Sequence, residues 1–351
     1  MKTDVLIVGG GLSGLALADE LHRTGVDFQL VEARDRFGGR IHAAHVDGIA
    51  YDLGPAWFWQ GQPRMAAATL RFGLAVFEQY SCGETVSEDH NSNIRRGTGY
   101  ASMAGSLRIV GGMAALVDAF AKSVPAKALH LKQTVTGISQ TQMGLLIVTD
   151  KLIISAKKVI LALPPRIAQT IIFDPALPAA QIHALGDVPT WMAGHAKILA
   201  IFDKPYWRDA GLSGDVKSRR GPLVEIHDAS PQLAGPYALS GFIGFDARTR
   251  AAHRDVMHKM VSDQLNRLFG AAPKKLILQD WAQEVQTATL ADHTNEAKPA
   301  YGRPAALSNI WDRRIIIGSS EMGQTFGGYL EGSLEVAQDV SNLLQQGCKL
   351  K

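Results

Sequence analysis

Six residues near the start of the chain have the types and spacing of a dinucleotide-binding turn. The run Gly9–Gly14 (Gly-Gly-Gly-Leu-Ser-Gly) fits G-x-G-x-x-G and directly follows the apolar run Val5–Val8. In this motif Gly9 permits the tight turn, Gly11 lets the backbone approach a pyrophosphate, and Gly14 lets a helix pack on the strand. The N–H groups that open the following helix favour phosphate. A glycine-rich turn without a ligand is the alternative at this stage.

An acid and a basic loop narrow the choice of dinucleotide. Glu32 directly follows the second apolar run, Val26–Val31, about twenty residues past the glycines. In a dinucleotide-binding fold a carboxylate at this place binds a ribose hydroxyl. It also repels a 2′-phosphate, so NADP is disfavoured as the cofactor. Two glycines, Gly38 and Gly39, are then flanked by arginines, as in a loop that closes over a pyrophosphate. Arg40 can contact a phosphate through two hydrogen bonds. These residues favour FAD over NAD.

The elements that must position these residues follow from periodicity and turn signals. The range 12–24 predicts a helix that ends at Gly25, and with its flanking strands it forms a βαβ unit. Asp47-Gly48 between two strand-like runs, 41–46 and 49–53, predicts a hairpin. Further strands are expected at 145–149, 152–154, 159–163, 198–202, 223–226, 239–245 and 315–318, and helices at 113–122, 250–268 and 328–344. The polar stretch 83–105 reads as the least structured part.

The order of these elements predicts the fold class. We expect an α/β protein, with a Rossmann-type FAD-binding domain and an inserted, reduced α+β substrate domain. The FAD-binding domain is expected to be discontinuous, made of residues 1–82, 106–189 and 281–351. The substrate domain is expected to comprise residues 83–105 and 190–280.

Composition excludes several classes of function. The formal net charge is +3, which gives no argument for nucleic acid or a membrane as partner. Two cysteines provide neither a disulfide framework nor a metal site, and they suit a reducing cytosol. We therefore expect a cytoplasmic protein without metal. The N-terminal residues lack the long apolar core and cleavage site of a signal peptide, so we expect none, and the sequence has no run of about twenty apolar residues.

From the glycine turn onward the chain resembles the flavin-containing amine oxidase family, the monoamine oxidase-like flavoproteins. The resemblance continues nearly to the C-terminus, in blocks at 52–57, 111–113, 134–138, 159–178, 195–208 and 315–334. It implies that Ser13, Glu32, Arg40 and Val135 bind the ADP half of FAD. It also places Glu321, Gly328, Tyr329 and Leu330 along the ribityl chain and flavin. With the glycine turn and the basic loop, the full set of residues expected on the cofactor is Gly9, Gly11, Leu12, Ser13, Gly14, Glu32, Ala33, Arg34, Gly39, Arg40, Val135, Glu321, Gly328, Tyr329 and Leu330.

The same resemblance implies roles on the substrate side. Lys197 matches a lysine that holds a water near flavin N5, and in an apolar strand its pKa should fall. Trp281 matches a tryptophan beside the flavin, and Tyr329 one wall of an aromatic cage for the substrate amine, with Trp57 also in the pocket. Lys197, Trp281 and Tyr329 are the expected catalytic residues. The alternatives are a lysine reaching out from a strand edge, a core tryptophan, and a tyrosine that only caps the flavin. The helix after Gly327-Gly328 would stabilise negative charge on reduced flavin.

Three departures from the family pattern concern the substrate side. The stretch Trp281–Asp292 has no tyrosine for the second cage wall, whose place falls near Ala291. It also has no cysteine, with Leu290 near the attachment point of some members, so FAD should be non-covalent. Only about thirty residues separate Tyr80 from Gly111, where the family usually has a long helical insertion. We therefore expect an open site or one completed by another subunit, with 87–106 as a reduced lid.

The leading functional hypothesis is oxidation of the C–N bond of a small amine. Hydride would pass to flavin N5, the imine would hydrolyse, and O2 would accept the electrons and give hydrogen peroxide. The first alternative is an FAD-dependent desaturase or an NAD(P)H-oxidising flavoprotein of the same superfamily, favoured by the missing tyrosine and the short substrate domain. The second is a flavoprotein that serves as a binding or structural module.

Overall fold

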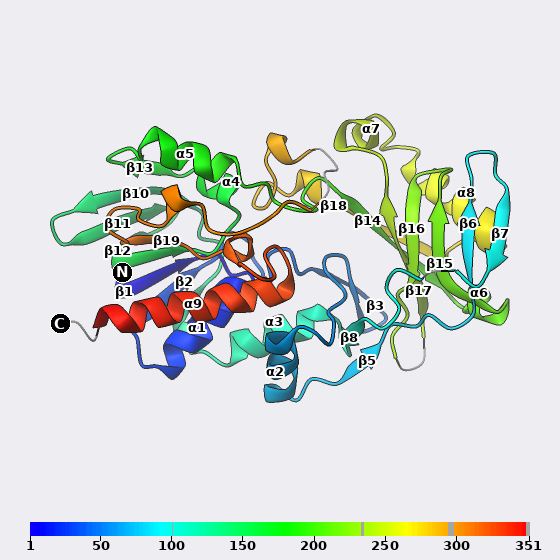
Figure 1. Ribbon diagram of the computed structural model, residues 1–351, viewed down its shortest axis with the longest axis horizontal. Helices are drawn as coiled ribbons and strands as arrows, with labels where there is room; N and C mark the ends of the chain where they lie inside the picture. The colour runs from blue at the N-terminus through cyan, green and yellow to red at the C-terminus, as the bar shows by residue number, and fades with distance from the viewer. Residues whose placement is uncertain (100, 233–234, 294–297, 349–351) are drawn as a thin grey trace.

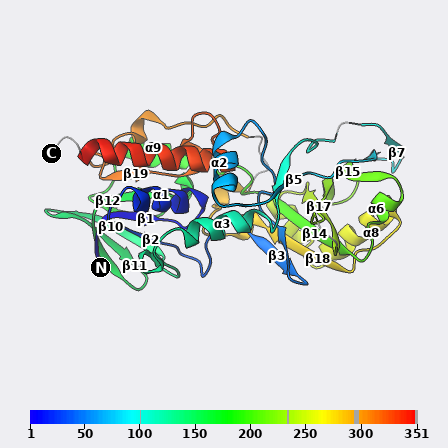
Figure 2. The same ribbon diagram turned by 90° about the horizontal axis from the view of Figure 1, so that it is seen from below.

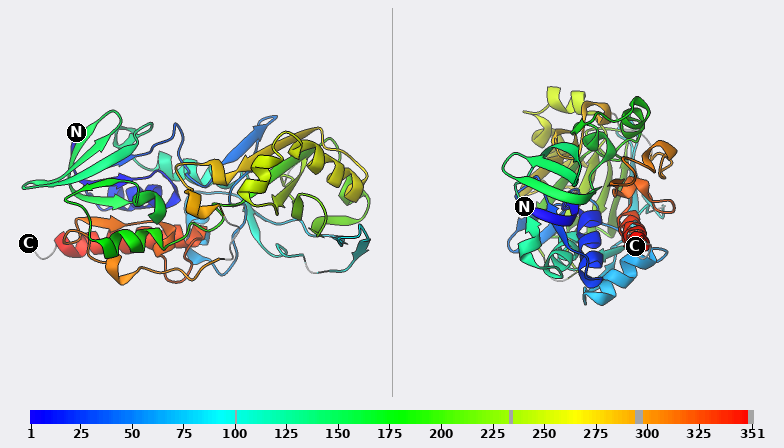
Figure 3. Two further views of the ribbon diagram at one scale, coloured as in Figure 1. Left: turned by 90° about the horizontal axis from the view of Figure 1, so that it is seen from above. Right: turned by 90° about the vertical axis from the view of Figure 1, so that its left-hand side faces the viewer.

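The computed structural model describes residues 1–99, 101–232, 235–293 and 298–348. The molecule is elongated, with two lobes that are each built around one β-sheet (Figure 1). The start of β1 and the end of α9 lie at the far end of the first lobe, as Figure 3 also shows. Among the described residues, no helix is long and apolar enough to cross a membrane. The same residues contain no cluster of His, Cys, Asp or Glu that could bind a metal.

The first lobe contains an eight-stranded sheet with the order β13-β10-β11-β12-β1-β2-β9, in which β19 also pairs with β12. The strands β19, β12, β1, β2 and β9 run parallel, as a Rossmann-type sheet requires. The apolar run expected in β1, Val5–Val8, is buried throughout, as in a central strand of a parallel sheet. The strands are β1 (Lys2–Val8), β2 (Phe28–Val31), β9 (Leu129–His130), β10 (Val135–Thr141), β11 (Gly144–Thr149), β12 (Ile153–Leu161), β13 (Ile172–Asp174) and β19 (Ile315–Ile317).

Helices α1, α3 and α9 cover one face of this sheet, and α1 lies against α9 along its length (Figure 2). The closing helix therefore returns the C-terminal segment to the first βαβ unit. The helices of this lobe are α1 (Leu12–Arg23), α2 (Pro63–Arg71), α3 (Met113–Lys122), α4 (Pro165–Ala168), α5 (Ala179–Gly186) and α9 (Leu330–Cys348). Short 3-10 turns occupy 126–128, 281–283, 290–292, 305–307 and 320–322.

The second lobe contains a seven-stranded, mostly antiparallel sheet with the order β18-β14-β17-β16-β15-β6-β7. Helix α8 packs its apolar residues on one face of this sheet and forms a separate core. The strands are β6 (Glu84–Glu88), β7 (Ile94–Gly97), β14 (Ala196–Phe202), β15 (Leu212–Ser218), β16 (Leu223–Asp228), β17 (Tyr237–Ile243) and β18 (Lys275–Asp280). The helices are α6 (Tyr206–Asp209), α7 (Ala247–Ala252) and α8 (Met257–Phe269).

Two small sheets lie between the lobes. The hairpin expected around Asp47-Gly48 forms from β3 (Ala43–Val46) and β4 (Ile49–Asp52), and both turn residues have positive φ. Its apolar residues pack with Leu199 and Ile201 of β14, on the opposite side of the second sheet from α8. The other pair joins β5 (Val76–Glu78) to β8 (Leu107–Ile109).

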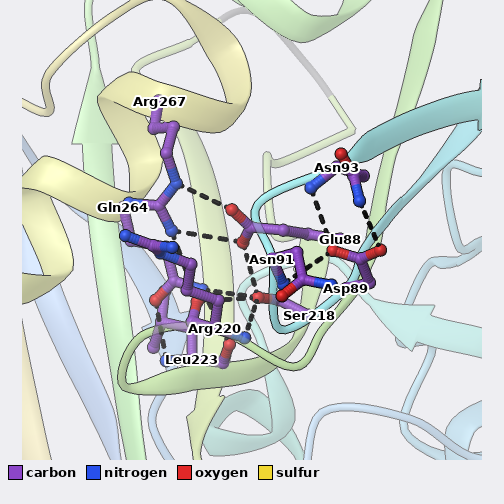
Figure 4. Close-up of polar contacts among 9 residues, drawn as sticks. All are labelled: Glu88, Asp89, Asn91, Asn93, Ser218, Arg220, Leu223, Gln264 and Arg267. Carbon is purple, nitrogen blue, oxygen red and sulfur yellow. Dashed lines mark hydrogen bonds and ion pairs between the residues drawn. The ribbon is translucent and has the colours of Figure 1, made fainter.

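The stretch 83–105, expected to be the least structured part, instead contains the β6–β7 hairpin, so the prediction of a loop was wrong. β6 pairs in parallel with β15 at the edge of the second sheet. Figure 4 shows how its polar side chains are satisfied: the buried Glu88 carboxylate accepts hydrogen bonds from Arg267 Nε and Ser218 Oγ, each at 2.7 Å. At the hairpin turn, Asp89 accepts from Asn91 and Asn93. Long-range polar pairing therefore stabilises a hairpin that has no apolar periodicity.

Other element predictions also needed correction. The run expected as two strands, 152–154 and 159–163, is the single strand β12, and β15 and β18 were not predicted. The helix expected over 250–268 is broken into α7 and α8. Arg250 is buried and donates to Asp280 of β18 and to the Gly194 carbonyl, which attaches α7 to the end of the sheet, whereas α8 lies over its face.

Candidate active site

A cavity of about 720 Å³ is lined by residues from both lobes. On one side it is bounded by the carboxyl ends of the parallel strands, and on the other by β14, β16 and β17 of the second sheet. Ligands of open α/β sheets bind at the carboxyl ends of the strands. Predicted residues that line this cavity are Gly9, Gly11, Leu12, Ser13, Trp57, Glu32, Ala33, Arg34, Gly39, Arg40, Val135, Lys197, Trp281, Gly328, Tyr329 and Leu330. Of the predicted set, Gly14 and Glu321 do not line it.

The glycine turn is packed too tightly for side chains. Gly9 has φ +110°, and a Cβ there would lie 2.5 Å from the Ala162 carbonyl oxygen. At Gly14 a Cβ would overlap the carbonyl oxygen of Gly9, so this glycine permits the contact between α1 and β1. Gly11 faces a more open space and forms a β-bridge with Gly38 of the following loop. The backbone therefore forms a cradle that opens into the cavity at Gly11.

Glu32 connects the end of β2 to this cradle. Its carboxylate accepts hydrogen bonds from Gly10 N at 2.7 Å and from Arg34 N at 2.9 Å. The side chain is almost fully buried but contributes to the cavity wall. The acid is thus held at the end of β2, in the wall of the cavity.

Arg40 is held by a carboxylate of the same chain. Its guanidinium donates to Glu321 through two bonds, Nη1–Oε1 at 2.7 Å and Nη2–Oε2 at 3.3 Å, and to Ser320 Oγ at 3.1 Å. Burial opposes the charged form, but Glu321 raises the pKa of Arg40 above its ordinary value. A phosphate ligand would therefore share this guanidinium with Glu321, whereas the sequence suggested a bidentate phosphate contact.

The start of α9 presents backbone N–H groups beside Tyr329. Gly328 has φ +81°, and a Cβ there would lie 2.6 Å from the ring of Tyr301. The acidic residue of the first turn, Glu331, points away from the cavity and accepts from Arg64 N and Met65 N at the start of α2. Because this carboxylate binds the start of α2, it does not neutralise the partial positive charge at the start of α9, which can act on a ligand in the cavity.

Lys197 lies in β14, which is flanked on both sides by other strands, so it is not a lysine at a strand edge. The side chain is 3% exposed, and Nζ donates to the Gly54 carbonyl at 2.9 Å. Nζ also lies 5.0 Å from the ring centre of Trp57 and 5.6 Å from that of Phe242. Burial lowers the pKa of Lys197 to about 8, against the opposing effect of Asp52. The expected fall in this pKa is confirmed.

Trp281 and Trp57 are fixed by hydrogen bonds of their indole groups. Trp281 Nε1 donates to the Leu53 carbonyl at 3.1 Å, and Trp57 Nε1 donates to Gln79 Oε1 at 2.8 Å. The ring of Trp57 meets His227 edge-on, with ring centres 5.2 Å apart. Both rings therefore have fixed orientations in the cavity wall.

Tyr329 has two aromatic neighbours that the sequence did not identify. Trp191 and Trp59 meet it edge-on, with ring centres 5.3 Å and 6.3 Å from that of Tyr329, and both line the cavity. The ammonium of Lys298 lies 4.8 Å from the ring centre of Tyr329. The segment searched for a second wall, near Ala291, does not line the cavity, and Leu290 is 85% exposed. The only signal in the sequence was that both tryptophans lie outside the predicted helices and strands.

A second group missed by sequence analysis lies at the other end of the cavity. Glu225 on β16 lines it, and its Oε1 accepts from Ser102 Oγ at 2.5 Å and lies 3.0 Å from His227 Nε2. His227 Nδ1 is 2.6 Å from Asp215 Oδ1. The hydrogen bond with His227 lowers the pKa of Glu225 to about 2, with burial acting in the opposite direction. A carboxylate that is charged at neutral pH thus faces the cavity.

The residues present fit a flavin dinucleotide. The glycine cradle leaves backbone where a side chain would collide, and Glu32 stands at the end of β2. Two buried polar atoms of the cavity wall, Ser319 Oγ and His195 Nδ1, have no partner within the described part of the chain. A bound polar ligand would supply such partners.

The fold and cavity define a two-lobed dinucleotide-binding protein whose nucleotide site opens onto a second sheet. Residues 7–71 match the NAD(P)-binding Rossmann-like domain, and residues 87–344 match the family described as flavin containing amine oxidoreductase. The chain belongs to this amine oxidoreductase family, and it is an oxidoreductase with a flavin cofactor.

Relatives and solved structures agree with this assignment. The chain is 21% identical to a probable flavin-containing monoamine oxidase A of Dictyostelium discoideum, over 96% of each chain. That alignment spans 448 positions, more than the 351 residues here, so the relative has segments that this chain lacks. Identity to the putrescine oxidase of Kocuria rosea is 23%, over 69% of this chain and 73% of the relative.

Two solved structures share the fold across nearly the whole chain. A putrescine oxidase bound to putrescine superposes with a TM-score of 0.84 at 19% identity, over 99% of each chain. The cyclohexylamine oxidase from Brevibacterium oxydans IH-35A superposes with a TM-score of 0.84 at 18% identity. These likenesses establish the architecture, in which both lobes are retained.

Proposed function

We propose that the protein is an FAD-dependent oxidase that oxidises the C–N bond of a small amine. The observation that carries the proposal is one cavity whose wall includes the glycine cradle at one end and Lys197, Trp281 and Tyr329 further along. Membership of an amine oxidoreductase family supports the choice of amine as substrate. We further propose that residues 83–105 and 190–280 form the substrate domain and that the rest of the chain forms the FAD-binding domain.

The nucleotide end of the cavity would bind the ADP half of FAD. Gly11 allows the close approach of the pyrophosphate, Glu32 accepts from the ribose, and Arg40 adds positive charge while staying paired with Glu321. The N–H groups at the start of α9 would lie beside the flavin ring, where they stabilise the negative charge of the reduced form. Among the described residues that line the cavity there is no cysteine, which supports non-covalent binding.

Bound there, FAD supplies the hydride acceptor at flavin N5 and then the electrons that convert O2 to hydrogen peroxide. The protein must deliver the amine in its neutral form, because an ammonium cannot release hydride. The rings of Tyr329, Trp191 and Trp59 give the amine an apolar environment that disfavours its charge. Lys197 Nζ, with its pKa of about 8, can hold a water by hydrogen bonding and give a proton to reduced oxygen.

The test is anaerobic reduction of the purified flavoprotein by a panel of primary and secondary amines. We expect the flavin absorbance to bleach with at least one amine, and readmitted air to restore it with one peroxide per flavin. NADH added in a parallel experiment should leave the flavin oxidised. Bleaching by NADH and by no amine would reject this proposal in favour of an NAD(P)H-oxidising flavoprotein.

A further inference from the structure

Three side chains that line the cavity stand in a row across the second sheet. The strand register places Lys197 of β14 opposite Phe242 of β17, and Phe242 opposite Glu225 of β16. Residues directly opposite each other in a sheet project from the same face. Two strand spacings separate the backbones of Lys197 and Glu225 by about 10 Å. The ring of Phe242 therefore lies between an amine at one end and a carboxylate at the other.

One oxygen of the Glu225 carboxylate is open to a ligand. Oε1 is occupied by Ser102 Oγ and His227 Nε2, whereas Oε2 has no hydrogen-bond partner within the described ranges. The Glu225 side chain is 31% exposed, and the residue lies in the cavity wall. His227 is also bonded to Asp215, so even a protonated His227 leaves these two carboxylates and one imidazole with a net negative charge. Lys217, opposite Glu225 in the strand register, is a further cation near this carboxylate, but it is exposed and does not line the cavity.

Most of the other charged groups in the cavity wall already have partners, and the Lys197 ammonium donates to the Gly54 carbonyl. The only other carboxylate that lines it, among the described residues, is Glu32, whose oxygens each accept a backbone N–H. Arg34 is paired with Glu284, and Arg40 with Glu321. Glu32 lies at the nucleotide end of the cavity, so Glu225 is the carboxylate of the wall that is placed on the second sheet to accept a hydrogen bond from a cationic ligand.

We propose that Glu225 binds a second, distal ammonium group of the substrate, so that the preferred substrates are aliphatic α,ω-diamines rather than monoamines. This inference rests on the proposed amine oxidase function. The alkyl chain would pack along Phe242 and Trp57, with the reacting amine towards Lys197 and Tyr329. The distal ammonium would stay charged and donate to Glu225 Oε2, which makes a charge-assisted hydrogen bond.

The test compares a graded series of α,ω-diamines with monoamines of the same chain length, by kcat/KM and by calorimetric binding to the dithionite-reduced holoenzyme, which cannot turn over. The native enzyme should prefer the diamine of best-fitting length, and Glu225→Gln should lower the diamine-to-monoamine ratio about ten- to a hundredfold in both measurements. Ser102→Ala, which keeps the charge of Glu225, should keep the preference. Glu78→Gln, which removes one exposed charge outside the cavity wall, should keep it too.

Two outcomes would overturn the proposal. The first is a native enzyme that binds and oxidises both series alike, and the second is a Glu225→Gln variant with an unchanged ratio. Failure of the amine oxidase function itself would look different, because no amine of either series would bleach the flavin. Binding of diamines to the reduced holoenzyme with the expected ratio would then still support Glu225 as a receptor for ammonium groups.

Discussion

Arg40 and Glu321 are separated by 281 positions in the sequence, yet Nη1 of the arginine lies 2.7 Å from Oε1 of the glutamate. The carboxylate is fully buried, while the guanidinium is 28% exposed and forms part of the cavity wall. This ion pair joins the loop after β2 to the segment before α9. It therefore fixes the nucleotide cradle relative to the helix that begins beside Tyr329.

Replacement of Glu321 by Gln should destabilise the protein and weaken flavin binding. The substitution leaves Arg40 without its anionic partner in a mostly buried place, at a cost of about 3 kcal/mol in the free energy of unfolding. Urea denaturation with and without added FAD measures the effect. Glu20→Gln is the matched control, because its pair with Arg23 is on the surface and should contribute less than about 1 kcal/mol. Equal losses in the two variants would contradict the prediction.

Replacement of Gly14 by Ala should prevent FAD from binding. The added methyl group would overlap the Gly9 carbonyl oxygen and force α1 away from β1, which opens the cradle. The purified variant should lack the visible flavin spectrum, and its melting temperature should fall. Gly97→Ala is the control, since no atom lies within 4 Å of a Cβ at that position. A Gly14→Ala protein with full flavin content would show that the cradle tolerates the shift.

Replacement of Lys197 by Met should slow reoxidation of the reduced flavin by oxygen. The ammonium stabilises negative charge that develops on oxygen, and its loss should reduce the rate at neutral pH at least about tenfold. In the native enzyme this rate should fall as pH rises through about 8, because Nζ then loses its proton. Stopped-flow mixing with oxygen across this pH range measures both effects. A methionine variant with the native rate and pH profile would exclude the role.

The ionisation of Lys197 should also affect how the free energy of unfolding depends on pH. Its folded-state pKa of about 8 lies below the ordinary value of 10.5, so between these values the unfolded chain binds more protons. The contribution of Lys197 to the free energy of unfolding should therefore rise with pH across this window. Denaturation midpoints from pH 7.5 to 10 should show a rise in the native protein that is smaller in Lys197→Met. A larger rise in the variant would contradict the assignment.

Replacement of Lys298 by Met should lower KM for the amine substrate. The Lys298 ammonium lies 4.8 Å from the ring centre of Tyr329 and 5.9 Å from that of Trp191. Lys298 does not itself line the cavity, but its positive charge lies beside the two rings on which a substrate amine would bind. Removal of this competing cation should decrease KM about two- to fivefold, within the usual strength of a cation–π contact. Lys298→Arg keeps the charge and should leave KM near the native value. An increase of KM in the methionine variant would show that Lys298 assists binding instead.

The sequence by itself determined the nucleotide half of the protein. The glycine turn, α1 and the acid at the end of β2 lie within one short βαβ unit, in which local spacing fixes geometry. Lys197 could be placed in a buried strand because the apolar run around it gave a clear pattern. The hairpin at Asp47-Gly48 was predictable because its turn type depends on two adjacent residues.

Only the tertiary structure decided the substrate side. The row Lys197–Phe242–Glu225 depends on the register of three strands whose order follows from long-range pairing. The aromatic neighbours Trp59 and Trp191 reach Tyr329 from separate loops, without any periodic signal in the sequence. The β6–β7 hairpin is polar, and its place in the sheet depends on side chains such as Arg267, far along the chain. Local patterns record burial and turn geometry, whereas the meeting of distant polar and aromatic side chains is fixed by packing between the elements.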